Sequence, residues 1–280
     1  MLSVGCVTVS TGSLAASNRF LQNLMSYWSR WSDAVRGARA ILESARSISF
    51  SQYSEDTLIY ALIPQRRGFY VDVGACHPWR SSNTYKLYLR GWSGLTIEPN
   101  PDIAPLFRRI RPRDVHVTAG VATQPGELQY FQFADAKLNS FRSEQKDLMG
   151  QTPISTIGVE CRPLQEIVDR HALGRAIDLI SVDCEGMDLA VLETLSWTTS
   201  RPCVAIVEDH EQFVLNNVGG RHSVIRAFLT ARGYALVSQG AFSFIYVDLA
   251  AFGTKRDSGF ALHRSQLRAI RRDPARQEPR

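Results

Sequence analysis

The fold of this chain is decided by the stretch Phe69-Tyr-Val-Asp-Val-Gly-Ala-Cys-His-Pro78. Its apolar first half ends at Gly74, as a buried strand ends at a tight turn. A second apolar run, Gly94-Leu-Thr-Ile-Glu-Pro-Asn100, ends at the acid Glu98. A strand, a glycine turn, a helix, a second strand and a terminal acid form the arrangement in which an α/β sheet binds a nucleoside. The two stretches therefore predict a nucleoside site made by the turn at Gly74 and the acid Glu98.

Strands and helices alternate from residue 50 to residue 248. Apolar runs predict strands at 69–74, 94–98, 115–121, 177–183, 203–208, 234–239 and 242–248. Helices are predicted near 53–63, 82–90, 102–110, 163–171, 187–196 and 221–232. Most strands lack alternation, which is typical of a parallel sheet with helices on both faces. The last two strands are joined tightly near Gly240 and must be antiparallel. We predict an α/β fold with a seven-stranded, mostly parallel sheet and an antiparallel last strand, the layout of Rossmann-like methyltransferases.

Two segments flank the α/β domain, which we place at residues 49–252. Residues 1–48 are predicted to be a helical extension, because apolar residues in 18–46 recur every three or four positions. Three uses remain open for this helix: docking on the domain, forming a homodimer seam, or lying on a membrane surface.

The C-terminal segment, residues 253–280, is predicted to be a basic tail. Residues 254–280 contain eight Lys/Arg and three Asp/Glu, so this segment accounts for the whole net charge of +5. The tail is either solvated or in contact with an anionic membrane or a polyanionic substrate. The body of the chain is neutral, and we expect no nucleic-acid partner.

Composition limits the class of protein. A chain of 280 residues with 44% hydrophobic content can form one domain with a full core. No window reaches the roughly 18 consecutive apolar residues of a membrane span, and no basic segment opens a signal peptide. Five cysteines without a CxxC pair argue against a disulfide framework and structural zinc. We expect a cytoplasmic protein, with peripheral membrane contact as the alternative.

Residues 122–160 interrupt the alternation. Gly126, Leu128, Tyr130 and Phe133 suggest a small hairpin, and a polar stretch follows up to Gly158. A loop of this length inside a compact domain is more often functional than idle. We place it over the active site as a lid or acceptor-binding element.

Acidic residues follow the fourth and fifth strands. The fourth strand ends in Asp183-Cys-Glu185, and the fifth ends in Glu208-Asp209-His210. Because ligands bind at the carboxyl edge of open α/β sheets, these side chains should crowd one rim. Carboxylates that close need a cation, a positively charged ligand or raised pKa values. A sulfonium ligand, a divalent metal and a general base all meet that need, and structural roles remain open for His210 and His77.

Six motifs, in this order and spacing, resemble those of the FkbM-type methyltransferases. They are Phe50-Ser-Gln-Tyr-Ser-Glu-Asp56, Phe69 to Pro78, Ser82-Asn-Thr84, Gly91-Trp-Ser-Gly94, Ile97-Glu-Pro-Asn-Pro101 and Asp183-Cys-Glu-Gly-Met-Asp-Leu189. The resemblance covers residues 49–248. It implies transfer of a methyl group from S-adenosylmethionine, usually to a hydroxyl of a sugar, glycan or secondary metabolite.

The resemblance also implies which residues hold the cofactor. Ser51 and Asp56 should flank the same pocket. The cofactor-binding set is then Gln52, Glu55, Asp72, Gly74, Glu98 and Asp183.

A hydroxyl acceptor must lose a proton, so a general base or a metal ion must assist the reaction. Our candidates for the base are Asp183 and His210, supported by Glu185 and Glu208. Should a metal bind, Asp183 and Glu208 are its predicted ligands, and their oxygen atoms favour Mg²⁺ or Mn²⁺ over zinc.

Two other classes of function compete with this interpretation. A nicotinamide-dependent oxidoreductase shares the strand, turn and acid, but its GxGxxG fingerprint is absent here. A non-catalytic glycan- or partner-binding module could use a degenerate methyltransferase domain. The intact acids at positions 72, 98, 183 and 208 argue against such a module.

Overall fold

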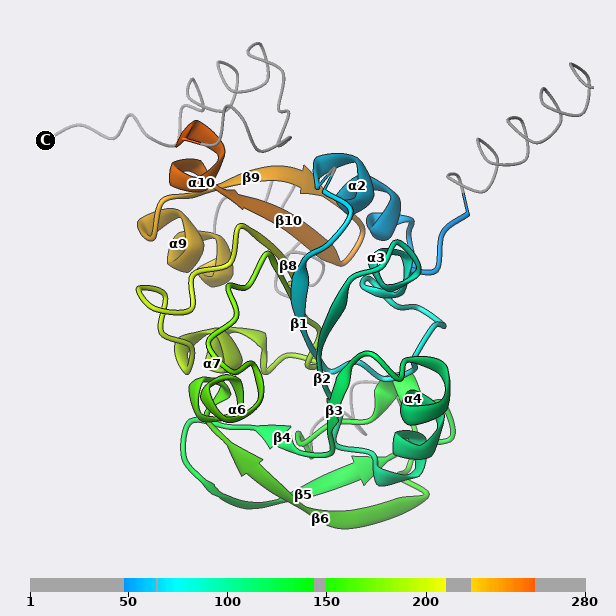
Figure 1. The fold of residues 1–280 in the computed structure, drawn as a ribbon. Coiled ribbons are helices and arrows are strands. Elements are labelled where there is room, and N and C mark those ends of the chain that lie inside the picture. The colour runs from blue at the N-terminus through cyan, green and yellow to red at the C-terminus, as the bar shows by residue number, and fades with distance from the viewer. Residues whose placement is uncertain (1–47, 64, 144–149, 210–222, 255–280) are drawn as a thin grey trace, which may run out of the picture. The chain divides into compact units, whose positions relative to one another are not determined.

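The computed structural model describes residues 48–63, 65–143, 150–209 and 223–254. They form a seven-stranded sheet in the order β3-β2-β1-β7-β8-β10-β9 and a three-stranded sheet in the order β4-β6-β5, which lies below the main sheet in Figure 1. The predicted N-terminal extension up to residue 47 and the predicted tail from residue 255 onward lie outside the described residues, as does His210.

The main sheet confirms the predicted architecture. Its strands are β1 (Phe69–Val73), β2 (Ser93–Ile97), β3 (Val115–Val117), β7 (Leu179–Val182), β8 (Val204–Glu208), β9 (Tyr234–Gln239) and β10 (Ser243–Asp248). The first five are parallel to one another, whereas β10 is antiparallel to both β8 and β9. The last strand lies between β8 and β9. Its antiparallel pairing with β9 is what the tight connection near Gly240 requires.

Helices cover the sheet on both faces. They are α2 (Glu55–Leu62), α3 (Tyr85–Leu89), α4 (Ala104–Ile110), α6 (Leu164–His171), α7 (Asp188–Glu193), α9 (Val224–Ala231) and α10 (Leu249–Thr254), with short 3₁₀ turns η1 (Pro101–Ile103) and η2 (Ala136–Leu138). In the part of the chain that the structure describes, no helix combines the length and the apolar character that crossing a lipid bilayer demands.

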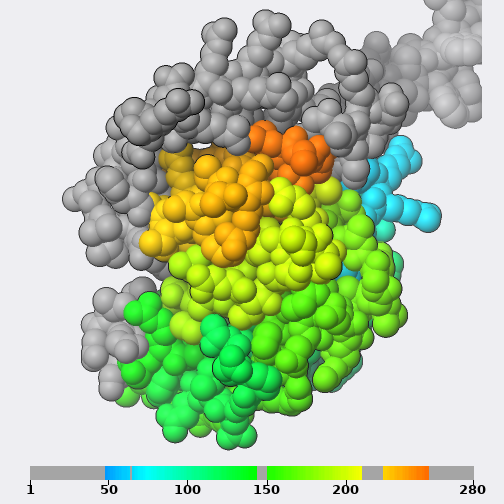
Figure 2. Space-filling model, turned by 90° about the vertical axis from the view of Figure 1, so that its left-hand side faces the viewer, coloured from blue at the N-terminus to red at the C-terminus, as the bar shows by residue number. Residues whose placement is uncertain are grey.

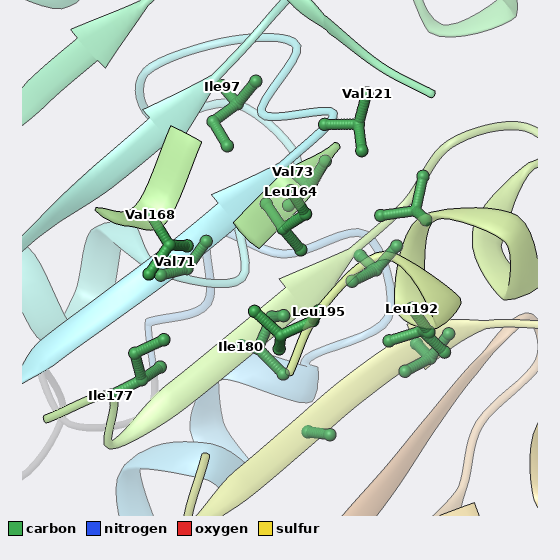
Figure 3. Close-up of a cluster of buried hydrophobic side chains, with 14 of the residues drawn as sticks. Val71, Val73, Ile97, Val121, Leu164, Val168, Ile177, Ile180, Leu192 and Leu195 are labelled. Carbon is green, nitrogen blue, oxygen red and sulfur yellow. The ribbon is translucent and has the colours of Figure 1, made fainter. Parts of the chain in front are cut away.

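The core has two layers because adjacent residues of a strand point to opposite faces. On one face, Val71 of β1 and Ile180 of β7 pack with α6 and α7, around Leu164 and Leu192 (Figure 3). On the other face, Tyr70 and Leu179 pack with residues of α2 and α3. Burial on both sides explains why these strands lack alternation. Figure 2 shows the yellow and orange later part of the chain above the green residues of the smaller sheet.

The predicted strand over 115–121 is wrong as a single element. β3 ends at Val117, and β4 (Gly120–Val121) pairs with β6 (Ser155–Arg162) in the smaller sheet. The chain can leave the main sheet here because Gly120 has no side chain: an added Cβ would lie 2.4 Å from the Cys161 sulfur. β5 (Gly126–Gln132) pairs antiparallel with β6, so the partner of the predicted hairpin begins inside the stretch predicted as loop.

The ends of β1, β2 and β7 meet in very close contact. The Gly74 amide donates to the carbonyl of Ile97 at 3.0 Å, and the Asp183 amide donates to the carbonyl of Val73 at 3.1 Å. Gly74 has a φ of +73°, and an added Cβ would lie 1.8 Å from the Asp183 carbonyl oxygen. Only glycine satisfies both the backbone conformation and the available space.

Replacing Gly74 with alanine should lower the free energy of unfolding by about 2–5 kcal/mol, because it adds left-handed backbone strain to a backbone clash. Denaturant unfolding of the Gly74→Ala variant measures this effect. Gly126→Ala is the matched control, since nothing lies within 4 Å of its added Cβ. Equal stability of the two variants would contradict the contact.

Candidate active site

A cavity of about 390 Å³ lies at the carboxyl edge of the main sheet. This volume falls in the usual range for small-molecule sites. The strand ends supply Gly74, Glu98, Asp183, Glu185 and Glu208 to its lining. Other walls come from residues 135–141, from Gln52 and from Phe242. Segments far apart in sequence therefore converge on one site.

Glu98 lies at this cavity and is almost completely buried, with 4% of its surface exposed. Its Oε2 accepts a hydrogen bond from the Cys76 amide at 2.8 Å, and its Oε1 accepts one from the Asn100 amide at 2.9 Å. The Tyr130 hydroxyl donates to Oε1 at 3.3 Å. Burial raises the pKa of Glu98, and these donors partly offset the rise. The carboxylate thus joins the turns after β1 and β2 while facing the cavity.

Cys76 follows Gly74 in the turn and also lines the cavity. Its φ of +48° is unusual for a residue with a side chain. Burial, followed by the charges of Glu98 and Asp183, raises the pKa of the Cys76 thiol to about 12. The thiol therefore stays protonated near neutral pH and is a poor nucleophile.

Three predicted acids that line the same cavity lie close together. Carboxylate oxygens of Asp183, Glu185 and Glu208 all lie within 4.8 Å of one another. Burial and the charge of Glu185 raise the pKa of Glu208 to about 8, and a hydrogen bond with Asp183 partly offsets this rise. The cluster can therefore hold a proton at neutral pH, as carboxylates this close are expected to do.

Asp188 shapes the turn that presents Glu185. Its carboxylate accepts hydrogen bonds from the amides of Cys184 at 2.9 Å and Gly186 at 3.1 Å. Glu185 has a φ of +51°, so the turn holds it in a left-handed conformation. Burial and the charge of Asp183 raise the pKa of Asp188 to about 7. Asp188 thus stabilises the loop before α7 and does not itself line the cavity.

The acids of the 50–56 motif accept hydrogen bonds from backbone amides and hydroxyls of their own segment. Asp56 is fully buried and accepts hydrogen bonds from the Ser49 hydroxyl, the Phe50 amide and the Ser51 hydroxyl. Glu55 accepts a hydrogen bond from the Tyr53 amide at 2.8 Å. These contacts form the turn before α2.

Gln52 is the residue of the 50–56 motif that lines the cavity. The motif therefore presents an amide to the site while its carboxylates hold the turn in place.

Asp72 does not line the cavity, although the sequence predicts that it helps to hold the cofactor. It accepts a hydrogen bond from the Thr84 hydroxyl and lies 3.9 Å from the buried guanidinium of Arg111. Arg111 also pairs with Asp114 at 2.6 Å and donates to the Pro78 carbonyl at 3.3 Å. This network fixes the segment after the β1 turn. Arg111 gives no sequence signal, because only the folded chain brings it to Asp72.

The smaller sheet supplies the wall opposite the strand ends. Ser140 exchanges two backbone hydrogen bonds with Phe131 at 2.9 and 3.1 Å, and the Asn139 side chain accepts from the Phe133 amide at 2.8 Å. Tyr130 and Phe141 pack with ring centroids 4.9 Å apart. Residues 135–141 are therefore held over the cavity, where the sequence places a lid or acceptor-binding element.

His77 and Asp209 do not line the cavity. The His77 Nδ1 accepts hydrogen bonds from the amides of Trp79 and Arg80 at 3.3 and 3.1 Å, so this histidine stabilises its own turn. Asp209 is 2% exposed and accepts from the hydroxyl of Ser223. His210 lies outside the described residues.

The residues of the cavity fit S-adenosylmethionine. Glu98 faces the space beside the turn of Gly74 and Cys76, where a nucleoside would lie with its ribose against the acid. Ile97, Val121 and Phe141 offer apolar surface for a base. The acids Asp183, Glu185 and Glu208 of the same cavity suit the positive charge of a sulfonium.

A comparison with known protein families identifies the family of this chain. The family model described as the methyltransferase FkbM domain matches residues 72–236, more than half of the chain. A search of curated proteins finds no match.

Two solved structures are similar at 14% sequence identity. One is a TehB-like SAM-dependent methyltransferase from Corynebacterium glutamicum, with a TM-score of 0.34, covering 80% of this chain and 99% of its own. The other is a methyltransferase from Geobacter sulfurreducens, with a TM-score of 0.38, covering 80% and 98%. The family assignment does not depend on these distant similarities. On the evidence of the family model, the chain belongs to the FkbM methyltransferase domain family, which implies S-adenosylmethionine as the methyl donor.

Proposed function

We propose that the protein methylates a hydroxyl oxygen of a sugar, a glycan or a secondary metabolite. The observation that carries the proposal is the position of Asp183, Glu185 and Glu208 in the same cavity as Glu98. S-adenosylmethionine, when bound, supplies an electrophilic methyl group. A hydroxyl acceptor needs a proton acceptor close to its oxygen, and the three carboxylates provide one beside the expected donor site.

The cluster would act as a proton acceptor because its carboxylates lie close together and the pKa of one of them is raised. Burial and the charge of Glu185 raise the pKa of Glu208 to about 8, although its hydrogen bond with Asp183 lowers it. A base works best when its pKa lies close to the operating pH. Asp183 would orient the acceptor hydroxyl and receive its proton together with Glu208. The charge of Glu185 raises the pKa of Glu208. Asp188 holds the turn that carries Glu185.

The lining of the cavity also supports a polyhydroxylated acceptor. Carboxylates and the amide of Gln52 can bind several hydroxyl groups. Phe242 lines the same wall and packs on Tyr53, with ring centroids 5.5 Å apart. An aromatic face beside polar groups suits the apolar face of a sugar ring. The cytoplasmic location and a homodimer through the N-terminal helix stay predictions.

Changing Asp183 to asparagine should reduce turnover by about 10²–10⁴-fold, because it removes one proton acceptor without changing side-chain size. The affinity for S-adenosylhomocysteine should change little. Turnover is measured with a panel of sugar hydroxyl acceptors, and affinity by titration calorimetry.

Asp169→Asn, an exposed site on α6, is the matched control for the same chemical change. A normally active Asp183→Asn variant would make Asp183 structural.

The three carboxylates could instead hold Mg²⁺ or Mn²⁺, since their oxygen atoms are close enough to share an ion. Assays with EDTA separate the two roles: a proton-accepting cluster keeps its activity, whereas a metal site loses it and regains it with Mg²⁺.

The pH dependence gives an independent prediction. If Glu208 must lose its proton, kcat/KM should rise with pH through a value near 8. Glu185→Gln removes the charge that raises this pKa, so the rising limb should move to lower pH. The pH profile of kcat/KM for the two proteins measures the shift. An unchanged profile would show that Glu208 does not control the rate.

A further inference from the structure

The edge of the main sheet opposite the cavity carries a concentration of arginine. Strands β1, β2, β3 and β7 all start there, because they are parallel. The segments that lead into them are residues 65–68, 90–92, 111–114 and 172–178. Their arginines with solvent-accessible side chains are Arg66, Arg67, Arg90, Arg113 and Arg175.

These segments lie against one another. The Trp92 indole donates to the Gln65 carbonyl at 3.1 Å, which joins the entry to β2 with the entry to β1. The Arg175 guanidinium donates to the Ser93 hydroxyl at 3.1 Å and joins the entry to β7 with β2. Arg113 stacks on Tyr88, 3.8 Å from the ring centre, at the end of α3. The arginines therefore belong to one surface.

The carboxylates of the same segments point inward. Asp114 pairs with the buried Arg111 and accepts from the Tyr70 hydroxyl. Asp178 accepts from the Phe69 amide at 2.9 Å and from the Gln65 side chain at 3.2 Å. Asp114 and Asp178 are the only acids of these four segments, and neither is exposed. Further along the same edge, the charge of Arg201 is compensated by its ion pair with Asp248.

Three aliphatic side chains are exposed beside these arginines. Leu89 ends α3 and is 57% exposed, Val115 begins β3 and is 41% exposed, and Leu173 follows α6 and is 82% exposed. Leu173 also has a φ of +52°, a conformation that costs a leucine about 1–2 kcal/mol. Backbone strain that keeps a leucine exposed to water suggests that this side chain contacts a binding partner.

We propose that this surface, the amino-edge patch of Arg66, Arg67, Arg90, Arg113, Arg175, Leu89, Val115 and Leu173, docks on an anionic lipid bilayer. Arginines would bind the lipid phosphates, and the leucines would enter the boundary between headgroups and acyl chains. Binding at a bilayer surface combines buried apolar area with attraction to anionic lipids, and this patch offers apolar and cationic side chains together. A nucleic acid would use the charge but would leave the aliphatic side chains in water.

The position of the patch has a consequence for catalysis. It lies at the amino ends of the strands, whereas the cavity lies at their carboxyl ends. A domain docked through the patch therefore presents its cavity away from the bilayer. The acceptor would reach the site from the aqueous side. This docking does not depend on which hydroxyl is methylated.

The test is co-sedimentation of the full chain with phosphatidylcholine vesicles that contain or lack phosphatidylserine. The double variant Arg66→Gln/Arg67→Gln removes two exposed charges. Each arginine near an anionic surface contributes about fivefold to affinity, so the variant should bind phosphatidylserine vesicles about 25-fold more weakly. Leu173→Asn should also weaken binding while keeping the fold, because asparagine tolerates the left-handed conformation.

The control Arg80→Gln/Arg162→Gln also removes two charges, from the exposed Arg80 and from Arg162, which is half-buried beside Glu160 and Glu166. Its vesicle binding should equal that of the parent. Equal losses in both double variants would mean that net charge alone drives binding, which overturns the proposal. Unchanged binding of the Arg66→Gln/Arg67→Gln variant would also overturn it. So would preferential binding to heparin or RNA over phosphatidylserine vesicles, since the patch would then serve a soluble polyanion.

Discussion

The contact between Gly74 and the carbonyl of Asp183 is the constraint on which the site depends. It brings the ends of β1 and β7 closer than any side chain at position 74 would allow. The Asp183 side chain thereby comes to the same cavity as the turn of Gly74 and Cys76. Glu98 then joins that turn to the end of β2 through its two backbone hydrogen bonds. A nucleoside pocket and a cluster of acids are thus formed by the same three strand ends.

The two groups of acids in the cavity differ in their surroundings. Glu98 is buried with three donors around it, which suits a fixed, ligand-binding role. Glu208 is buried beside other carboxylates, and its pKa rises from 4.5 to about 8. A raised acid pKa means that the associated stability is present below pH 4.5 and is lost as the pH rises through 8. Such unfavourable charge is typical of functional sites, where chemistry rather than stability selects the residues.

The sequence predicted a seven-stranded, mostly parallel sheet with an antiparallel last strand and the strand-end acids, because apolar runs, Gly74 and Glu98 are local signals. The sequence was a poor guide where the structure depends on residues that are distant in sequence but close in space. The break between β3 and β4 depends on the fit of Gly120 against Cys161, and the position of Asp72 depends on Arg111, 39 residues away in sequence. Asp56 resembled a pocket residue but holds its own turn. The family match argues for a methyltransferase over the oxidoreductase considered from the sequence.

The most direct test of the central claim is a crystal structure of the protein with S-adenosylhomocysteine. The account predicts that the adenosine lies between the Gly74–Cys76 turn and Glu98, with the ribose hydroxyls on the Glu98 carboxylate. The sulfur should then lie toward Asp183 and Glu208. A nucleoside bound elsewhere, or a cavity that stays closed at saturating ligand, would contradict it.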